Sequence, residues 1–361
     1  MKLKISELGK VITGNTPSKK IKEFWDKDDV GFVKPDIISD EHIVKIKSKD
    51  CNEFISNAAI SKARIVPTNS IFVTCIGNIG KIGVATENLA FNQQINAIIP
   101  NENVNLDYLC YAIFANKTRL QDIANAPIVP LLNKSQFSEF ELEFDMDINT
   151  QTRIVHELNT VSNIILKYKQ ELLLLDELVR ARFVEMFGDP IYNTQNRPMT
   201  EFINVVKMQR GYDLPVQDRN HEGSIPVYGA NGVLGYHDVA KINNGGIITG
   251  RSGTIGKVYL ANKEYWPLNT SLFSIETYGN NLIYLQYLVT LYDLKRFVEG
   301  TGVPTLNRNM FHNKKIIEVP INEQNTFASF VEEVDKSRSR IQKSLEASQE
   351  LFDSLMQEYF G

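Results

Sequence analysis

Several hallmarks of common protein classes are scarce in this chain of 361 residues. It has only three cysteines, Cys51, Cys75 and Cys110, and their spacing fits neither a zinc site nor a disulfide framework. No apolar run reaches the roughly 18 residues of a membrane-spanning helix, and residues 1–7 lack the apolar core of a secretion signal. We therefore expect a cytoplasmic protein with reduced thiols and no contact with a membrane.

Motifs that would indicate catalysis are also missing. The glycine-rich segments 77–81 and 253–257 superficially suggest a phosphate-binding loop. The glycine that opens such a loop is replaced by Cys75 in one segment and by Arg251 in the other, and an aliphatic residue follows each lysine where Ser or Thr is required. No histidine cluster has metal-ligand spacing, and neither a nucleophile elbow nor a pair of carboxylates is evident. The sequence predicts no enzyme acting alone, and no cofactor or metal in this chain.

The chain carries little excess charge. Its 39 Lys and Arg against 43 Asp and Glu give a net charge of −4. Nucleic-acid binding needs a local basic surface rather than a basic total, so this balance weakens that function without excluding it. We expect the chain alone to bind a phosphate backbone only modestly, with basic partners supplying the remaining contacts.

The most informative feature is an internal repeat. Residues 69–188 and 244–361 carry the same landmarks in the same order, and each copy ends in Phe-Gly. A tandem repeat predicts two similar modules related by pseudo-symmetry. The matched segments are Thr74–Lys81 with Thr249–Lys257 (one residue inserted), Phe91–Ile95 with Leu268–Leu272, Asn105–Leu109 with Asn281–Leu285, and Val129–Asn133 with Val303–Asn307.

Each copy closes on a long helical pattern. Apolar residues recur at spacings of four and three from Ile154 onward and again from Phe327 onward, with interruptions at Arg182, Arg338 and Ser348. Such a repeat predicts a coiled coil, and the two helices are the natural partners for each other in an antiparallel pair. The alternative is that each apolar stripe packs on its own domain.

Together these patterns predict an α+β protein. Two pseudo-symmetric globular domains rich in short β-strands are separated by two long antiparallel coiled-coil helices. Residues 71–74 and 95–99 are expected to be strands, and residues 106–124 a helix. The expected division is a first domain at 1–148, a helix at 149–188, a second domain at 189–320 that begins with a linker at 189–200, and a second helix at 321–361.

Polar side chains in equivalent loops form the candidate binding site. Residues 92–94 match 269–271, Asn78 matches Thr254, and Ile76 matches Arg251 and Ser252. Asn, Gln, Arg, Ser and Thr are side chains that recognise base edges, although a surface or turn role stays open for each. Lysine contacts with phosphate are weighed against plain turn chemistry in the same way. The candidate DNA-binding residues are Lys81, Asn78, Asn92, Gln93, Gln94, Arg251, Ser252, Thr254, Lys257, Asn269 and Thr270.

Four stretches, at 225–236, 247–259, 266–270 and 306–324, resemble the specificity subunits of Type I restriction-modification systems. The first half departs from that pattern, because Cys75 and Ile76 replace the usual polar or basic pair. The resemblance implies that each globular domain is a target recognition domain and that together they recognise a two-part, asymmetric sequence in double-stranded DNA. The helices would set the gap between the two parts.

The same resemblance implies a subunit without catalytic residues of its own. It would dock two modification subunits, which carry S-adenosylmethionine and methylate adenine, and in some complexes two restriction subunits with motor and nuclease activity. The helices would form the docking surface, through Leu158, Ile165, Leu172, Leu345 and Phe352, with Ile341 left unassigned.

Three other functions remain open on the sequence. One is a specificity subunit of a solitary methyltransferase without a nuclease. Another is a structural coiled-coil adaptor, which would explain the helices but not the repeated polar loops. An autonomous enzyme is the third, and nothing among the motifs supports it.

Overall fold

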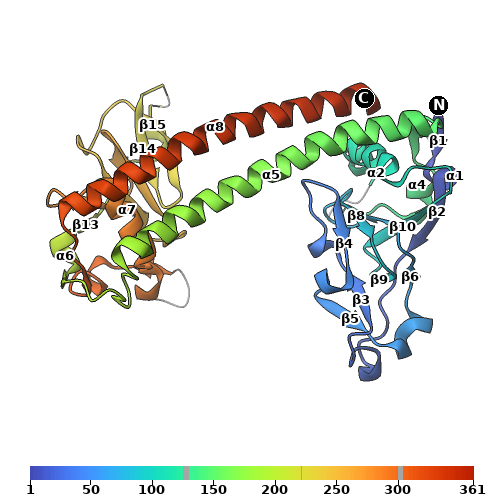
Figure 1. The fold of residues 1–361 in the computed structure, drawn as a ribbon, viewed down its shortest axis with the longest axis horizontal. Coiled ribbons are helices and arrows are strands. Elements are labelled where there is room, and N and C mark those ends of the chain that lie inside the picture. The colour runs from blue at the N-terminus through green and yellow to red at the C-terminus, as the bar shows by residue number, and fades with distance from the viewer. Residues whose placement is uncertain (125–129, 221, 300–303) are drawn as a thin grey trace. The chain divides into compact units, whose positions relative to one another are not determined.

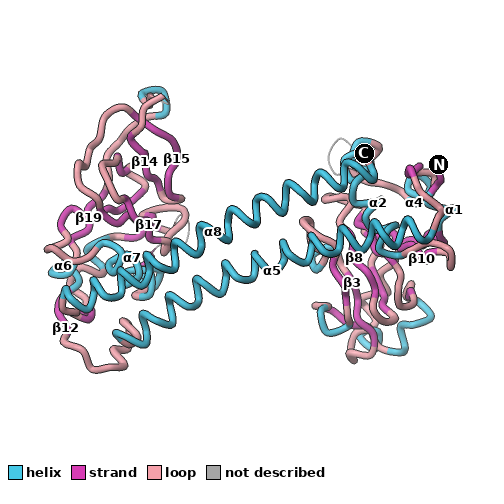
Figure 2. The backbone as a smooth tube through the Cα atoms, turned by 45° about the horizontal axis from the view of Figure 1, so that its top comes forward, coloured by secondary structure: helices cyan, strands magenta, loops and turns pink. Residues whose placement is uncertain are grey.

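The computed structural model describes residues 1–124, 130–220, 222–299 and 304–361 (Figure 1). The chain divides into two compact units, the first made of residues 1–167 and 345–361 and the second of residues 168–344. Two long helices, α5 (Ile148–Phe187) and α8 (Ile321–Phe360), contribute one half to each unit. The predicted fold class is confirmed, since a long helix lies between two strand-rich domains in the chain (Figure 2).

The first unit is built on a five-stranded sheet of order β2-β10-β7-β8-β4. A second sheet of order β5-β3-β9-β6 and the pair β1-β11 complete it. Its strands are β1 (Lys2–Lys4), β2 (Gly9–Thr13), β3 (Val30–Val33), β4 (Val44–Ile46), β5 (Glu53–Ile55), β6 (Ile65–Val66), β7 (Ile71–Thr74), β8 (Ile82–Ala85), β9 (Leu89–Phe91), β10 (Ile95–Pro100) and β11 (Glu141–Glu143), and its short helices are α1 (Ile5–Leu8), α2 (Leu106–Ala115), α3 (Lys117–Asp122) and α4 (Lys134–Ser138).

The second unit has a four-stranded sheet of order β13-β19-β16-β17, a sheet of order β15-β14-β18 and the pairs β12-β22 and β20-β21. Its elements are β12 (Met199–Glu201), α6 (Phe202–Val205), β13 (Lys207–Arg210), β14 (Ile225–Gly229), β15 (Gly232–His237), β16 (Gly246–Gly250), β17 (Val258–Ala261), β18 (Trp266–Pro267), β19 (Ser271–Glu276), α7 (Leu282–Leu291), β20 (Val298–Glu299), β21 (Thr305–Leu306) and β22 (Lys315–Ile317).

The two units share the strand order of four strands in their main sheets. The order β2-β10-β7-β8 in the first corresponds to β13-β19-β16-β17 in the second, and β1-β11 corresponds to β12-β22. Helices α2 and α7 both begin after an asparagine cap, Asn105 or Asn281, whose side chain accepts a backbone N–H of the first turn. The sequence repeat is therefore a structural repeat, as predicted.

Each unit pairs its halves of α5 and α8 in antiparallel fashion. In the first unit, the beginning of α5 packs against the end of α8, and the Tyr359 hydroxyl donates to Glu157 at 2.5 Å. In the second, the end of α5 packs against the beginning of α8, and Arg338 pairs with Asp176 at 2.7 Å. The buried side chains are Leu158, Val161, Ile165, Phe352, Met356 and Phe360 in the first unit and Val179, Phe183, Phe187, Phe327, Val331 and Val334 in the second.

The same apolar stripes also pack on their own domains. The ring of Phe352 lies 6.1 Å from that of Tyr111 on α2, and Phe183 stacks 5.8 Å from Tyr284 on α7. Burying one such side chain contributes about 1.5–3 kcal/mol, so these contacts fix each helix half to its domain. The sequence left two alternatives open, that the helices pair with each other or that each packs on its own domain. In the structure both kinds of contact occur.

One predicted element differs in its length. The helix expected at 106–124 is interrupted at Asn116, where α2 has ended and α3 has not begun. The Asn116 amide donates to the Ala112 carbonyl at 2.9 Å, so the side chain caps the backbone that a longer helix would use. Of the predicted match between 129–133 and 303–307, Val129 and Val303 lie outside the described residues. The remaining positions do correspond, because the Leu132 N–H donates to the Cys75 carbonyl at 2.9 Å and the Leu306 N–H donates to the Arg251 carbonyl at 2.8 Å.

No helix among the described residues combines the length and the apolar character needed to cross a bilayer.

Candidate nucleic-acid interface

In the first unit, three loops meet at one end of the main sheet. They are the β7–β8 turn at 75–81, the β9–β10 turn at 92–94 and the segment 14–16 that follows β2. The Cys75 N–H donates to the Gln94 carbonyl at 2.8 Å, and the Gly14 N–H donates to the Ile95 carbonyl at 3.1 Å. A Cβ on Gly14 would lie 2.0 Å from the Asn92 carbonyl oxygen, so only glycine permits this approach.

The second unit forms the same loop cluster. The Arg251 N–H donates to the Thr270 carbonyl at 2.8 Å, and the Gly211 N–H donates to the Ser271 carbonyl at 3.1 Å. A Cβ on Gly211 would lie 2.2 Å from the Leu268 carbonyl oxygen. Most of the predicted DNA-binding residues are thus brought together, as one set in each unit.

These hydrogen bonds correct the predicted alignment of the two copies. The Asn15 N–H donates to Phe91 and the Tyr212 N–H to Pro267, so Phe91 is equivalent to Pro267. Gln93 therefore corresponds to Asn269, where the sequence matched Asn92 to Asn269. Cys75 likewise corresponds to Arg251, with no inserted residue before the glycine turn. Matching the two copies by residue identity pairs the asparagines Asn92 and Asn269. Because the loop side chains have diverged, this match is one position away from the backbone equivalence.

The glycine turns that carry the two lysines are alike in backbone conformation. Gly77 and Gly80 have φ angles of 73° and 89°, and Gly253 and Gly256 have 83° and 95°. These left-handed conformations suit glycine and shape a tight turn. The structure thus agrees with the interpretation of these segments as turns that carry a lysine.

The two lysines differ in their surroundings. Lys257 is exposed, and within the described parts of the chain its ammonium has no ion-pair partner. Lys81 is half-buried, and its Nζ donates to the Pro35 carbonyl at 3.4 Å. Nearby, a hydrogen bond from Lys117, followed by one from Asn78 and the charge of Lys81, lowers the pKa of the Asp40 carboxyl. Lys257 is therefore better placed for a phosphate than Lys81, and Asn78 is engaged within its unit.

The amides of the first unit are partly used within the turn. Asn92 is buried, with its Nδ2 donating to Gln94 Oε1 at 2.9 Å and its Oδ1 accepting the Gln94 N–H at 3.1 Å. Gln93 is exposed, and its Oε1 accepts from Thr16 Oγ1 at 2.6 Å. Asn92 thus shapes the turn, whereas Gln93 and Gln94 reach its surface.

In the second unit, Asn269 is half-exposed and its Nδ2 donates to Asp213 Oδ1. Thr254 and Thr270 are exposed, and Arg251 and Ser252 are half-buried. Asp213 and its counterpart Thr16 were not among the residues that the sequence predicted. Both stand two positions after a glycine that follows the first sheet strand, and the shared Gly-x-polar pattern was the available signal.

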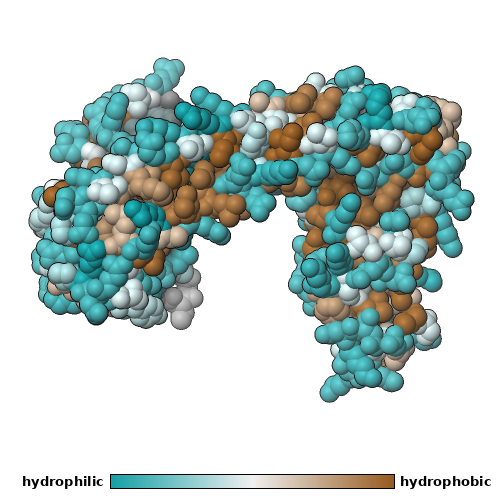
Figure 3. All heavy atoms as spheres, viewed as in Figure 1, coloured by the Kyte–Doolittle hydropathy of each residue, from teal (hydrophilic) through white to brown (hydrophobic). Residues whose placement is uncertain are grey.

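The helix residues predicted to dock partners lie mostly inside the units. Leu158, Ile165 and Phe352 are buried in the core of the first unit, so their side chains face neighbours in the same chain. Leu172, Ile341 and Leu345 are half-buried. Apolar side chains do reach the surface along the helices (Figure 3), and the exposed ones are Ile148, Ile164, Leu166, Leu173, Leu174, Leu178 and Val184 of α5 and Ile321 and Leu351 of α8.

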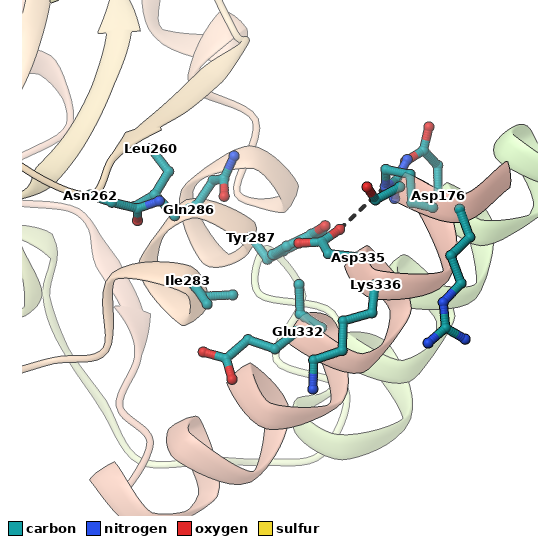
Figure 4. Close-up of a pocket in the computed structure, with 13 residues that line it drawn as sticks. Asp176, Leu260, Asn262, Ile283, Gln286, Tyr287, Glu332, Asp335 and Lys336 are labelled. Atoms are coloured by element: carbon teal, nitrogen blue, oxygen red, sulfur yellow. Dashed lines mark hydrogen bonds and ion pairs between the residues drawn. The ribbon is translucent and has the colours of Figure 1, made fainter. Parts of the chain in front are cut away.

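An open pocket of about 890 Å³ lies in the second unit, between the paired helices and α7 (Figure 4). Arg338 lines it and pairs with Asp176 and Asp335. The equivalent position in the first unit holds the buried Ile165, so a charged residue on the apolar stripe accounts for the opening. Ion pairs line the pocket, and no metal-ligating cluster occurs among the described residues.

The fold and these loops define a duplicated recognition scaffold, in which polar side chains vary on a repeated framework. The family model for the Type I restriction modification DNA specificity domain matches residues 1–174 and 193–349. The chain belongs to this family and carries two regions that match its domain.

Curated relatives and a solved structure agree with this assignment. The chain is 30% identical over 191 residues to the Type I restriction enzyme MjaIX specificity subunit of Methanocaldococcus jannaschii, covering 52% of this chain and 43% of that one. It is 34% identical over 142 residues to the HindI specificity subunit of Haemophilus influenzae, covering 38% and 30%. The matches thus span less than half of either relative.

A crystal structure of the S subunit of the Type I restriction-modification system of M. genitalium has the same fold. It superposes with a TM-score of 0.63 at 15% identity, covering all of this chain and 96% of the other.

Proposed function

We propose that this chain is the DNA-specificity subunit of a Type I restriction-modification complex and that it recognises a two-part, asymmetric DNA sequence. The observation that carries this proposal is the equivalent loop cluster on each unit. Both clusters have the same backbone hydrogen bonds, but their side chains differ. Gln93 in the first unit is equivalent to Asn269 in the second, and Cys75 is equivalent to Arg251. A constant scaffold with different polar groups suits two domains that recognise two different base sequences.

The chain would contribute recognition rather than catalysis. The family is one of DNA recognition, and the chemistry would belong to modification subunits that bind S-adenosylmethionine and act with this chain on cytoplasmic DNA. Two such subunits, and in some complexes two restriction subunits, would dock through the helices. The exposed Leu173, Leu174 and Leu178 of α5 support this role, because apolar side chains on a helix surface favour burial by a partner.

The test is selection of bound duplexes from a randomised DNA library by the full-length chain co-expressed with the methyltransferase subunit of the same source. The expected product is one sequence motif in two unlike parts, separated by unspecified base pairs. Binding that depends on salt but shows no sequence motif would contradict the proposal and favour a non-specific DNA-binding protein. Absence of DNA binding by the assembled complex would favour a structural adaptor.

We further propose that the long helices set the number of unspecified base pairs. Inserting one heptad between Lys167 and Tyr168 and another between Ser344 and Leu345 leaves the contacts within each unit intact. The two parts of the motif should be unchanged and the gap between them longer. A variant with the original gap would contradict this role for the helices.

A further inference from the structure

One pair of equivalent side chains is held in opposite orientations by the two units. Gln93 and Asn269 occupy the same backbone position. Each is hydrogen-bonded by a residue from the segment that follows the first sheet strand, Thr16 in one unit and Asp213 in the other. Thr16 and Asp213 are themselves equivalent, because each follows the residue whose N–H donates to the start of the same turn.

In the second unit the orientation of the amide is forced by the chemistry of its partner. An ionised carboxylate accepts hydrogen bonds but donates none. The group of Asn269 that faces Asp213 is therefore its NH2, as the Nδ2 to Oδ1 hydrogen bond shows. The carbonyl oxygen Oδ1 of Asn269 has no partner among the described residues and is left as an acceptor.

In the first unit the direction of the hydrogen bond is reversed, because the amide of Gln93 accepts where that of Asn269 donates. Thr16 Oγ1 donates to Gln93 Oε1 at 2.6 Å, and the Gln93 NH2 group has no partner among the described residues. A hydroxyl can also accept, so Thr16 allows this orientation, whereas Asp213 forces the opposite one. Gln94 follows the same rule. Its backbone N–H fixes Asn92 Oδ1 as an acceptor, so the Asn92 NH2 donates to Gln94 Oε1 and leaves the Gln94 NH2 group unused among the described residues. At the position of Gln93 the first unit therefore has a donor where Asn269 gives the second unit an acceptor, and Gln94 adds a donor at the next position.

We infer that Asp213 and Thr16 determine which bases the two units recognise, because Asp213 fixes the amide orientation of Asn269 and Thr16 allows Gln93 the opposite orientation. The inference rests on the proposed function. In the major groove, adenine and cytosine carry an exocyclic NH2 donor, whereas guanine and thymine carry an exocyclic carbonyl acceptor. At the exocyclic group of the base that each meets, Asn269 accepts from adenine or cytosine, and Gln93 donates to guanine or thymine. Asp213 and Thr16 are positioning residues that need not touch DNA.

The test reverses each orientation in the full-length chain, again co-expressed with its methyltransferase subunit and a randomised duplex library. Lysine at position 213 can only donate, so Asp213→Lys should turn the Asn269 carbonyl inward and its NH2 outward. Thr16→Asp should turn the Gln93 NH2 inward. Each variant should change the ratio of NH2-bearing to carbonyl-bearing bases by about ten-fold at one position of one half of the motif. The two changes should be opposite in sense and fall in different halves.

Charge-matched controls separate orientation from electrostatics. Asp218→Lys and Ser18→Asp make the same changes of charge at exposed positions close in sequence, and should leave base preference unaltered. A uniform loss or gain of affinity in Asp213→Lys, with the original base at every position, would overturn the inference while the wild-type motif still supported the proposed function. A wild-type complex without a motif would instead remove the proposed function itself.

Discussion

The side-chain carbonyl of Gln324 accepts the backbone N–H of Asn281 at 2.9 Å, and this contact fixes the start of α8 to the start of α7. Gln324 is buried, and its Nε2 also donates to the Val319 carbonyl at 2.7 Å. The first unit repeats the arrangement, with Gln151 accepting from Asn105 at 2.8 Å. One buried glutamine thus orients the long helix on its domain in each unit.

Replacing Gln324 with alanine should destabilise the second unit. The Asn281 N–H and the Val319 carbonyl would lose their partner in a site that water reaches poorly, at a cost of about 2 kcal/mol. Urea unfolding of the full-length chain, followed by circular dichroism, measures this loss. Gln349→Ala on the exposed surface of α8 is the matched control and should change the free energy of unfolding by no more than about 0.5 kcal/mol. Equal effects of the two substitutions would contradict the anchoring role.

His312 predicts a dependence of stability on pH. Burial, with the nearby charges of Arg308 and Lys207, lowers the pKa of His312 to about 4, and its Nε2 accepts the Met208 N–H at 3.2 Å. The unfolded chain, with an ordinary histidine pKa near 6.5, binds the proton more readily. The stabilisation that neutral His312 gives the folded chain is therefore complete above about pH 6.5 and is lost as the pH falls through about 4.

The variant His312→Gln separates this titration from that of the carboxylates, since a glutamine oxygen can still accept the Met208 N–H. The difference in free energy of unfolding between the wild type and the variant should shift in favour of the variant as the pH falls from 7 to 4.5. A difference that stays constant over this range would show that His312 does not titrate in this way.

The two turn lysines should differ in their contribution to DNA affinity. Lys257→Ala should weaken binding to all sequences without changing base preference, and should reduce the slope of log K against log salt by about 1. Lys81→Ala should have a smaller effect, because Lys81 Nζ already donates to the Pro35 carbonyl. Fluorescence anisotropy of the reconstituted complex at several salt concentrations measures both. An unaltered salt slope for Lys257→Ala would rule out its phosphate contact.

Much of the fold followed from the sequence because its signals are periodic or repeated. The apolar spacing along α5 and α8 survives the interruptions at Arg182 and Arg338, since burial on one side is enough to fix a helix of this length. Glycines with positive φ, such as Gly77 and Gly253, recur because few other residues adopt that conformation.

The loop sites were harder to predict, for physical reasons. Residue identity paired Asn92 with Asn269, but backbone hydrogen bonds pair Gln93 with Asn269, and composition carries no information about such bonds. Asn92 is another example, because its side chain is buried and hydrogen-bonded within the turn, which its residue type alone does not reveal. The roles of Thr16 and Asp213 depend on contacts with residues far along the chain, at separations of 77 and 56 residues.

The central claim is that each unit recognises its own half of a two-part DNA sequence. The most direct measurement compares the motifs selected from one randomised library by the wild-type complex and by complexes with Gln93→Ala or Asn269→Ala. Each substitution should relax base preference in one half of the motif only, and the two substitutions should affect different halves. Loss of preference in the same half, or in neither, would contradict the claim.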